Sequence, residues 1–325
     1  MDKVFLTGAT GFIGGHVLTT LLDSGYAVRA LVRQGSSAAT LDRRCETVRG
    51  DLQHTGALVR QIQGCRFLIH CGALYSFSPR DRAAMWRTNV VGTMGILEAA
   101  RIAAVERTVI TSSSATVGAC DPHSPATEQN WEVDWGHRSS YHGSKLAQER
   151  CALGAQLAVV RLLPSAPVGP ADRRPTPTGK MIVDFMRSRM FATLSGGMNL
   201  VAVEDVALAH VRALQMGRTG QRYLVGGANL TLTEIFGTLA SICKTRAPTR
   251  VLPTWVALGL GAADRALGIG RRERQPSIPM EGVRMATRFM YLDDSKARRE
   301  LDHRPSDVAL ALDRAVKWFQ QAGYA

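Results

Sequence analysis

The sequence predicts an α/β fold, in which a doubly wound parallel sheet is followed by a smaller, mixed C-terminal lobe. Through the first half of the chain, short apolar segments alternate with segments of helical periodicity, as they do in consecutive βαβ units. These segments are apolar on both faces, which is typical of parallel strands that helices cover on both sides. After Pro164 the pattern changes to a long stretch rich in proline and glycine, and we place the boundary between the lobes there.

Each expected element follows from its local pattern. Runs of apolar residues predict strands at residues 3–7, 26–32, 45–52, 66–73, 107–114 and 157–164. Helical spacing between them predicts helices at residues 12–24, 55–63, 82–104 and 140–154. Beyond the proline-rich loop we expect helices near residues 180–190, 203–216, 233–244, 253–267 and 307–322, and one more strand at 221–227. The chain is therefore divided into residues 1–164 and 165–325, with roughly 199–228 returning to the first sheet.

Chain length and net charge limit the classes of protein to which this sequence can belong. With 325 residues, of which 45% are hydrophobic, the chain can bury a full core. Its formal net charge of +13 could indicate a nucleic acid or an anionic membrane surface as a partner. However, the basic residues are spread along the chain apart from a dense cluster at 270–274, without zinc-finger spacing or an RNA-binding aromatic pattern. We therefore expect no nucleic-acid partner.

Cysteine usage and hydropathy bear on location. The six cysteines form no CxxC pair and no disulfide framework, so we expect reduced thiols in a cytoplasmic protein and no metal site. The first apolar run is interrupted by glycine and threonine, so it is not expected to be a signal peptide, and the chain has no run of 18 apolar residues. The segment 251–274 is apolar and then basic. It could make peripheral contact with a membrane, although a buried helix of the second lobe is the simpler interpretation.

A glycine-rich turn connects the first predicted strand to the first predicted helix. Gly8, Gly11 and Gly14 have the spacing G-x-x-G-x-x-G. In such a turn the first glycine permits tight bending, the second lets the backbone approach a pyrophosphate, and the third lets the helix pack against the strand. The N–H groups at the start of the helix would then bind phosphate, so we predict a Rossmann-type dinucleotide site. The same site is expected to include Thr10, Phe12 and Ile13.

The ends of the second and third strands bear on the choice of dinucleotide. An enzyme that uses NAD often carries an acidic residue after the second strand, where it binds the ribose 2′-hydroxyl. This chain has Arg33 there, which could pair with a 2′-phosphate, so NADP(H) is the preferred cofactor and NAD(H) the alternative. Arg33 could also simply be solvated. Asp51, after the third strand, could bind the adenine amino group or cap a turn.

Tyr141 and Lys145 stand near the start of a predicted helix and suggest acid–base chemistry. Residues four positions apart share one helical face, so both can point into one site. A free tyrosine has a pKa of about 10, and a nearby ammonium would lower it, so that the phenol could exchange a proton near neutral pH. The alternative is a surface tyrosine beside a solvated lysine, and the pair alone does not decide between them.

Further motifs occur in a fixed order along the chain. The first half contains TGATGFIG, GDL, TNVVGT, TSSSATVG and YHGSK. Together they resemble the extended short-chain dehydrogenase/reductases of the NAD-dependent epimerase/dehydratase superfamily. In the second half, PSAPVGPADRRPTPTGKMIVDF, NLVAVEDVALAH, RYLVGGANLTLTEI and GVRMA are similar to the hopanoid-associated sugar epimerase group, itself similar to the dihydroflavonol reductases. The resemblance therefore extends through nearly all of the chain.

This resemblance implies a Ser–Tyr–Lys catalytic set. Tyr141 would exchange the proton, Lys145 would lower its pKa and hold the nicotinamide ribose, and a serine after the fifth strand would hydrogen-bond the substrate oxygen. We assign that serine to Ser113, because Ser114 would point to the other side of an extended chain. Asn89 matches a family asparagine on the long helix and joins the expected catalytic residues. The remaining residues expected at the cofactor are Leu52, Ala73, Ser112 and Pro164.

The expected substrate site combines a loop after the fourth strand with the proline-rich loop. Tyr75 and Phe77 would suit an apolar or ring-bearing molecule, although core packing explains them equally well. Ser114 is a further candidate. Arg173 and Lys180 could bind a diphosphate, or they could belong to a solvated loop.

Three functions remain open on the sequence. We place first the NADP(H)-dependent interconversion of a ketone and a secondary alcohol on a ring-bearing or lipophilic small molecule. The alternative is a nucleotide-sugar epimerase that retains NAD, against which we note Val117, where many such epimerases carry a tyrosine. The third is a non-enzymatic dinucleotide sensor, which the presence of Ser113, Tyr141 and Lys145 disfavours. The resemblance also suggests a homodimer formed through the helices predicted at 82–104 and 140–154.

Overall fold

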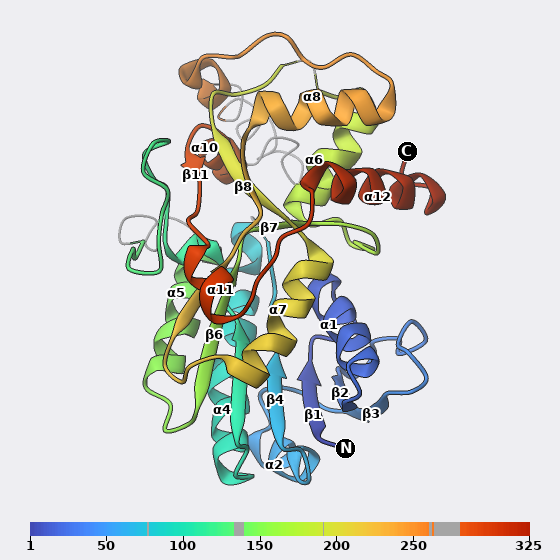
Figure 1. The fold of residues 1–325 in the computed structure, drawn as a ribbon, viewed down its shortest axis with the longest axis vertical. Helices are drawn as coiled ribbons and strands as arrows, with labels where there is room; N and C mark the ends of the chain where they lie inside the picture. The colour runs from blue at the N-terminus through green and yellow to red at the C-terminus, as the bar shows by residue number, and fades with distance from the viewer. Residues whose placement is uncertain (77, 133–139, 191, 260–261, 263–279) are drawn as a thin grey trace.

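A parallel sheet of seven strands forms the centre of the larger lobe (Figure 1). The computed structural model describes residues 1–76, 78–132, 140–190, 192–259, 262 and 280–325. The strands stand in the order β3-β2-β1-β4-β5-β6-β9, so the order reverses between β1 and β4. Their bounds are β1 (Lys3–Thr7), β2 (Ala27–Val32), β3 (Glu46–Arg49), β4 (Phe67–His70), β5 (Arg107–Thr111), β6 (Val159–Pro164) and β9 (Arg222–Val225). The predicted α/β class is confirmed.

Helices cover both faces of this sheet. On one face lie α1 (Phe12–Asp23) and α7 (Val203–Met216), and on the other α2 (Thr55–Ile62), α4 (Gly92–Ile102) and α5 (Ser140–Leu153). Side chains alternate along β1 accordingly. Val4 and Leu6 pack in the core that includes α1 and α7, whereas Phe5 packs in the core that includes α2 and α4. Burial on both faces explains why these strands are continuous apolar runs in the sequence.

The smaller lobe has its own sheet and its own core. Its central strand, β8 (Gly197–Ala202), pairs antiparallel with β10 (Ala228–Thr231) and parallel with β7 (Ala166–Val168) and β11 (Phe289–Met290). Apolar side chains from α6 (Pro177–Met186), α8 (Leu232–Cys243) and α12 (Val308–Gln321) form a separate core against this sheet. Beyond residue 279 the described chain also contains two shorter helices, α10 (Met280–Ala286) and α11 (Ser295–Glu300), of which α11 packs against β9 of the large sheet. Between β8 and β10 the chain returns to the large sheet as α7 and β9.

The helix predicted at 82–104 is interrupted. The structure has α3 (Arg82–Trp86), a π-helical turn (Arg87–Val91) and then α4. Within this segment Thr93 Oγ1 donates to the carbonyl oxygen of Asn89 at 2.7 Å. Single π-helical turns inside helices are frequent at functional sites, and this one contains Asn89.

Two other predictions need comment. The helix expected near 180–190 starts earlier, because Thr176 caps it by accepting a hydrogen bond from Gly179 N and Pro177 occupies its first turn. The helix predicted at 253–267 lies only partly within the described residues, and the basic cluster at 270–274 lies outside them.

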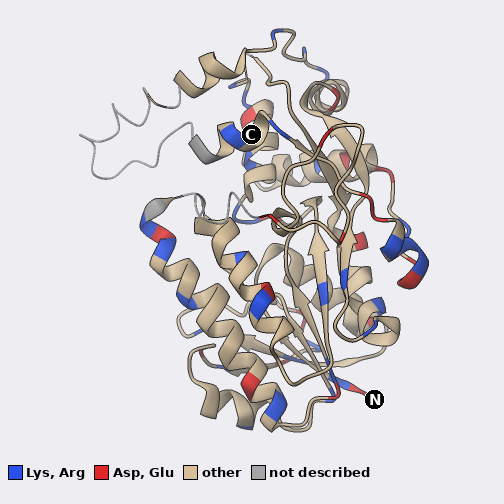
Figure 2. Ribbon diagram, turned by 90° about the vertical axis from the view of Figure 1, so that its left-hand side faces the viewer, with Lys and Arg blue, Asp and Glu red and all other residues tan. Residues whose placement is uncertain are grey.

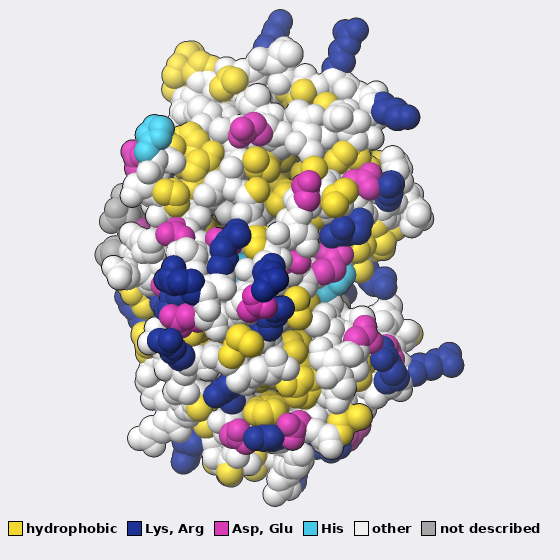
Figure 3. Space-filling view, viewed as in Figure 1, with side chains coloured by type: hydrophobic (Ala, Val, Ile, Leu, Met, Phe, Trp, Pro, Cys, Tyr) yellow, Lys and Arg dark blue, Asp and Glu magenta, His cyan; other side chains and the backbone are white. Residues whose placement is uncertain are grey.

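Charges of both signs are interspersed along the chain and over the surface (Figures 2 and 3). Several exposed charges form ion pairs, such as Arg44 with Asp23 at 3.0 Å and Arg66 with Asp2 at 2.9 Å. Within the described ranges, no helix combines the length and the apolar character that crossing a membrane requires.

Candidate active site

The glycine turn follows β1 at the point where the strand order reverses. Gly8 has a φ of +79°, and a Cβ on it would lie 2.6 Å from the carbonyl carbon of Cys71. A Cβ on Gly14 would lie 2.1 Å from the carbonyl oxygen of Gly8. Both positions therefore require glycine. The backbone N–H of Gly11 donates to the same Gly8 oxygen at 2.9 Å, which closes the turn directly before α1.

This turn fits a dinucleotide. Gly11 is the N-cap residue of α1 and offers no side chain to the first N–H groups of the helix. A pyrophosphate bound there would accept hydrogen bonds from these N–H groups and interact favourably with the positive end of the helix dipole. Next to the turn, the Gly72 N–H donates to Thr7 Oγ1 at 3.1 Å, which fixes the segment after β4 beside the end of β1.

The other residues expected to contact the cofactor lie at the carboxyl ends of the strands or directly after these ends. Arg33 directly follows β2 and is exposed, and its carbonyl oxygen accepts a hydrogen bond from Arg49 Nη1 at 3.2 Å. Arg49, at the end of β3, is a second basic residue near this position that the sequence reasoning missed. Asp51 Oδ1 accepts from Gln53 N at 2.9 Å, so this carboxylate caps a turn. The other expected positions are Leu52 in the same turn, the exposed Ala73 after β4 and the buried Pro164 at the end of β6.

Tyr141 occupies the first turn of α5 and is 8% exposed. The ring of Tyr75 lies over it, with 4.1 Å between the ring centroids and 32° between the planes. Burial raises the pKa of Tyr141 to about 12, while a side-chain hydrogen bond with Ser113 acts in the opposite direction. The pKa of Tyr141 is therefore raised and not lowered as expected, because the desolvation of the phenolate outweighs the hydrogen bond with Ser113.

Lys145 lies one helical turn further along α5 and is almost fully buried. Its Nζ donates to the carbonyl oxygen of Thr111 at 3.1 Å and to Gln148 Oε1 at 2.9 Å. Burial lowers the pKa of Lys145 to about 8, and Cys71 and Glu149 act weakly against this. The lysine is thus held at the end of β5 by protein acceptors.

The three serines after β5 have different environments. Ser112 Oγ donates to Glu149 Oε2 at 2.9 Å, so its hydroxyl hydrogen is bound by a buried carboxylate on α5. Ser113 Oγ accepts from Ala115 N at 3.2 Å and caps a 3-10 turn at Ser114–Thr116. The chain turns at Ser114 and does not stay extended, so an extended backbone does not explain the choice of Ser113 over Ser114. The hydrogen bond between Ser113 and Tyr141 now supports the same choice.

Asn89 does not lie on a helix surface. It is fully buried, and its amide accepts from Leu74 N at 2.7 Å and donates to Leu74 O at 2.9 Å. Its Nδ2 also donates to Ser144 Oγ on α5 at 3.0 Å. These bonds hold the segment that carries Tyr75 against the helix that carries Tyr141.

Of the expected substrate residues, only some lie near Tyr141. Tyr75 stacks on it, Ser114 is partly buried in the turn beyond Ser113, and Phe77 lies outside the described residues. Lys180 forms an ion pair with Asp184 one turn along α6, which leaves it less suited to bind a diphosphate. Arg173 is exposed, and its carbonyl oxygen accepts a hydrogen bond from Tyr324 at the C-terminal end of the chain.

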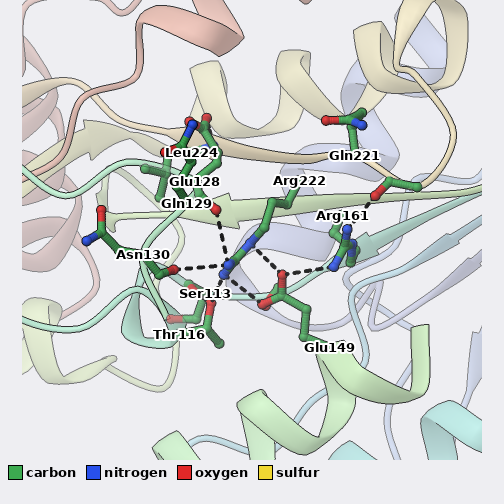
Figure 4. A network of polar contacts seen from close by, with 12 residues as sticks. Ser113, Thr116, Glu128, Gln129, Asn130, Glu149, Arg161, Gln221, Arg222 and Leu224 are labelled. Atoms are coloured by element: carbon green, nitrogen blue, oxygen red, sulfur yellow. Dashed lines mark hydrogen bonds and ion pairs between the residues drawn. The ribbon is translucent and has the colours of Figure 1, made fainter. Parts of the chain in front are cut away.

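Sequence reasoning missed a buried charge network behind the candidate site (Figure 4). Arg222 Nε lies 2.8 Å from Glu149 Oε1, and Arg161 Nη1 lies 3.5 Å from the same oxygen. Arg222 also donates to the carbonyl oxygen of Asn130 at 3.1 Å, and its guanidinium lies 3.8 Å from the ring centroid of Trp131. The network ties α5, β6 and β9 to the loop that leads toward Tyr141. Its signal in the sequence is an arginine within each of two apolar strands, since a charge placed there needs a partner.

Comparison with known proteins agrees with this geometry. The model of the NAD dependent epimerase/dehydratase family matches residues 4–226. A Synechocystis protein named "Putative dihydroflavonol 4-reductase" is 40% identical over 99% of this chain and 96% of its own length. The sterol demethylase protein B of Methylococcus capsulatus is 32% identical over 98% of each chain. Among solved structures, the crystal structure of gox2253 covers 100% of this chain and 99% of its own, with 32% identity and a TM-score of 0.87.

The family uses a nicotinamide dinucleotide, and the glycine turn is built to accept one. On the match to the family model and on the similarity that runs along nearly its full length, this chain belongs to the NAD-dependent epimerase/dehydratase family.

Proposed function

We propose that this protein is an NADP(H)-dependent oxidoreductase that interconverts a ketone and a secondary alcohol on a ring-bearing or lipophilic substrate. The observation that carries the proposal is the Tyr141 hydroxyl, which is buried, hydrogen-bonded with Ser113 and covered by the ring of Tyr75. A phenol in this position can donate a proton to a carbonyl oxygen, and the neighbouring aromatic ring provides an apolar surface for a substrate ring. The names of the Synechocystis and Methylococcus relatives refer to multi-ring compounds, a flavonoid and a sterol.

The roles of the side chains follow from their positions. The bound dinucleotide supplies the hydride in the reductive direction. Tyr141 donates its proton to the substrate oxygen, so that the carbonyl carbon and oxygen gain one hydrogen each and the phenolate remains on the enzyme. Ser113 hydrogen-bonds Tyr141. We assign to the ammonium of Lys145, on the same helical face, the stabilisation of the phenolate.

The preference for NADP(H) rests on the exposed Arg33 directly after β2, with Arg49 bonded to its carbonyl oxygen. Two guanidinium groups at this position can neutralise a 2′-phosphate, whereas neither offers the carboxylate that would accept from a 2′-hydroxyl.

The first experiment is mass spectrometry of the ligand released from denatured, freshly purified protein, followed by titration with NADPH and NADH. We expect the protein to prefer NADPH, and Arg33→Ala to weaken NADPH binding about tenfold or more, because it removes a charged hydrogen bond, with little effect on NADH. The exposed Arg304, which pairs with Asp302, provides the control Arg304→Ala.

Stoichiometric NAD released from the protein would contradict the proposal. It would favour the nucleotide-sugar epimerase, whose internal oxidation and reduction need a retained cofactor. Tight NADPH binding with no turnover of any ketone or alcohol would instead favour a dinucleotide sensor.

A further inference from the structure

A chain of buried hydrogen bonds runs from the glycine turn to Lys145. Thr7, the last residue of β1, places its Oγ1 2.7 Å from His70 Nδ1, and His70 Nε2 lies 2.9 Å from Thr93 Oγ1. Gln148 Nε2 donates to the same threonine oxygen at 3.0 Å. Gln148 Oε1 then accepts from Lys145 Nζ at 2.9 Å. None of these five residues is more than 3% exposed.

The hydroxyl of Thr93 fixes the direction of the bonds around it. It donates its single hydrogen to the carbonyl oxygen of Asn89, so toward Gln148 and His70 it can only accept. Gln148 must therefore present its NH₂ group to Thr93 and its carbonyl oxygen to Lys145. A rotated amide would lose both bonds.

The remaining bonds agree with this arrangement. Because His70 donates from Nε2 to Thr93, its Nδ1 accepts from the hydroxyl of Thr7. The oxygen of Thr7 is then available to accept the N–H of Gly72. The orientation of Gln148 is thus linked through side chains to the turn that would hold the dinucleotide.

Lys145 Nζ donates two of its three hydrogens, one to Thr111 O and one to Gln148 Oε1. Within the described part of the chain the third hydrogen has no acceptor, so it is available to a ligand. Of the two acceptors, the Thr111 oxygen belongs to the sheet and cannot move independently. The side chain of Gln148 is therefore the partner whose chemistry can change the position and charge of the lysine.

Few charged groups compete with Gln148 around the lysine. On β4 and directly after it, burial lowers the pKa of His70 to about 3 and raises that of the Cys71 thiol to about 12, so both are neutral near pH 8. On α5, Tyr141 is neutral as well, and Glu149 is paired with two arginines, Arg161 on β6 and Arg222 on β9. From α7, His210 contacts the hydroxyl of Thr111 and is neutral, because burial lowers its pKa to about 4.

We propose that Gln148 is a positioning residue for Lys145. Its amide oxygen holds the ammonium at the end of β5 and leaves one N–H for the cofactor ribose, while its NH₂ group is anchored to Thr93. This inference rests on the proposed function, because it assigns Lys145 to the binding of the cofactor. The contact between Gln148 and Lys145 can be tested without that assumption.

The test is an NMR titration of Lys145 in the full chain labelled with [¹³C]lysine. The Lys145 signal is the one that is missing from the spectrum of Lys145→Arg. The wild-type midpoint is expected near pH 8. Gln148→Met keeps the side-chain length but removes the acceptor, so the midpoint should fall by about one pH unit. Gln148→Glu places a carboxylate on the ammonium and should raise it by about one pH unit or more. Gln320→Glu, the same change on an exposed face of α12, should leave it unchanged.

Equal midpoints in the wild type and both Gln148 variants would overturn the proposal. NADPH binding, followed by fluorescence over the same pH range, then tests the link to the cofactor. We expect binding to weaken as Lys145 loses its proton, and this transition to move with the NMR midpoint of each variant. If the midpoints move but NADPH binding does not follow them, the role of Gln148 stands and the assignment of Lys145 to the cofactor fails.

Discussion

Replacement of Arg222 by methionine tests how strongly the fold depends on the buried charge network (Figure 4). The guanidinium is buried, lies 2.8 Å from Glu149 and donates to Thr116 Oγ1 at 2.8 Å. Methionine nearly fills the same space but removes all of these contacts. Loss of one partner of a buried ion pair costs about 3–5 kcal/mol, because the other charge stays buried. Since Arg161 still lies 3.5 Å from Glu149, we expect the lower end, about 3 kcal/mol of unfolding free energy.

The assay is urea unfolding followed by circular dichroism, with Arg304→Met as an exposed control that should leave the unfolding midpoint nearly unchanged. In the Arg222→Met background, Glu149→Gln should recover part of the loss, because it removes the uncompensated carboxylate. Hydrogen exchange should also rise at residues 128–131, because Arg222 donates to the carbonyl oxygens of Glu128 and Asn130. A loss below about 1 kcal/mol, the range of an exposed ion pair, would refute the reasoning.

Tyr141→Phe should lower turnover by at least about 100-fold with NADPH binding intact, and normal turnover would exclude Tyr141 as the proton donor. Because burial lowers the pKa values of His70 and His210 to about 3 and about 4, the unfolded chain binds protons below pH 6.5 that the folded chain does not. The free energy of unfolding should therefore decrease as the pH is lowered, by up to about 1.4 kcal/mol per pH unit for each histidine. Urea midpoints measured between pH 7 and 4.5 should depend less steeply on pH in His70→Asn than in the wild type. We also propose a homodimer through the adjacent α4 and α5, because Met94 and Ile102 on α4 and Leu153 on α5 are 53–55% exposed, and Trp86 at the end of α3 is 50% exposed. Light scattering should show a monomer for Met94→Glu but not for Leu310→Glu on α12.

Local patterns predicted the parts of the site that a single segment encodes. Gly8 and Gly14 are required by contacts within the turn itself and with the neighbouring strand end, so their spacing indicates the turn directly. Tyr141 and Lys145 share one helix, and the period of the helix places them on one face. The apolar strands were predictable for a similar reason, because burial on both faces leaves an uninterrupted run.

Contacts between distant segments could not be predicted in this way. Gln148 contacts Thr93, which is 55 positions away in the sequence, and Arg222 contacts Glu149, which is 73 positions away. Sequence periodicity does not predict which distant side chains tertiary packing brings together. The same limit explains the error over Tyr141. A nearby lysine is visible in the sequence, whereas the burial that raises the pKa of the phenol arises from tertiary packing, which includes Met85 and the ring of Tyr75.

The protonation states of Tyr141 and Lys145 indicate how each direction of the proposed reaction should depend on pH. Burial raises the pKa of Tyr141 to about 12, so we expect the phenol to hold its proton at neutral pH. Reduction of a ketone needs the proton that this phenol already holds, whereas oxidation of an alcohol needs the rare phenolate as a base. Lys145, with a pKa of about 8, keeps most of its charge at pH 7 and can stabilise the phenolate that reduction leaves behind. On the proposed function, we therefore expect oxidation of an alcohol to gain on reduction of a ketone as the pH rises.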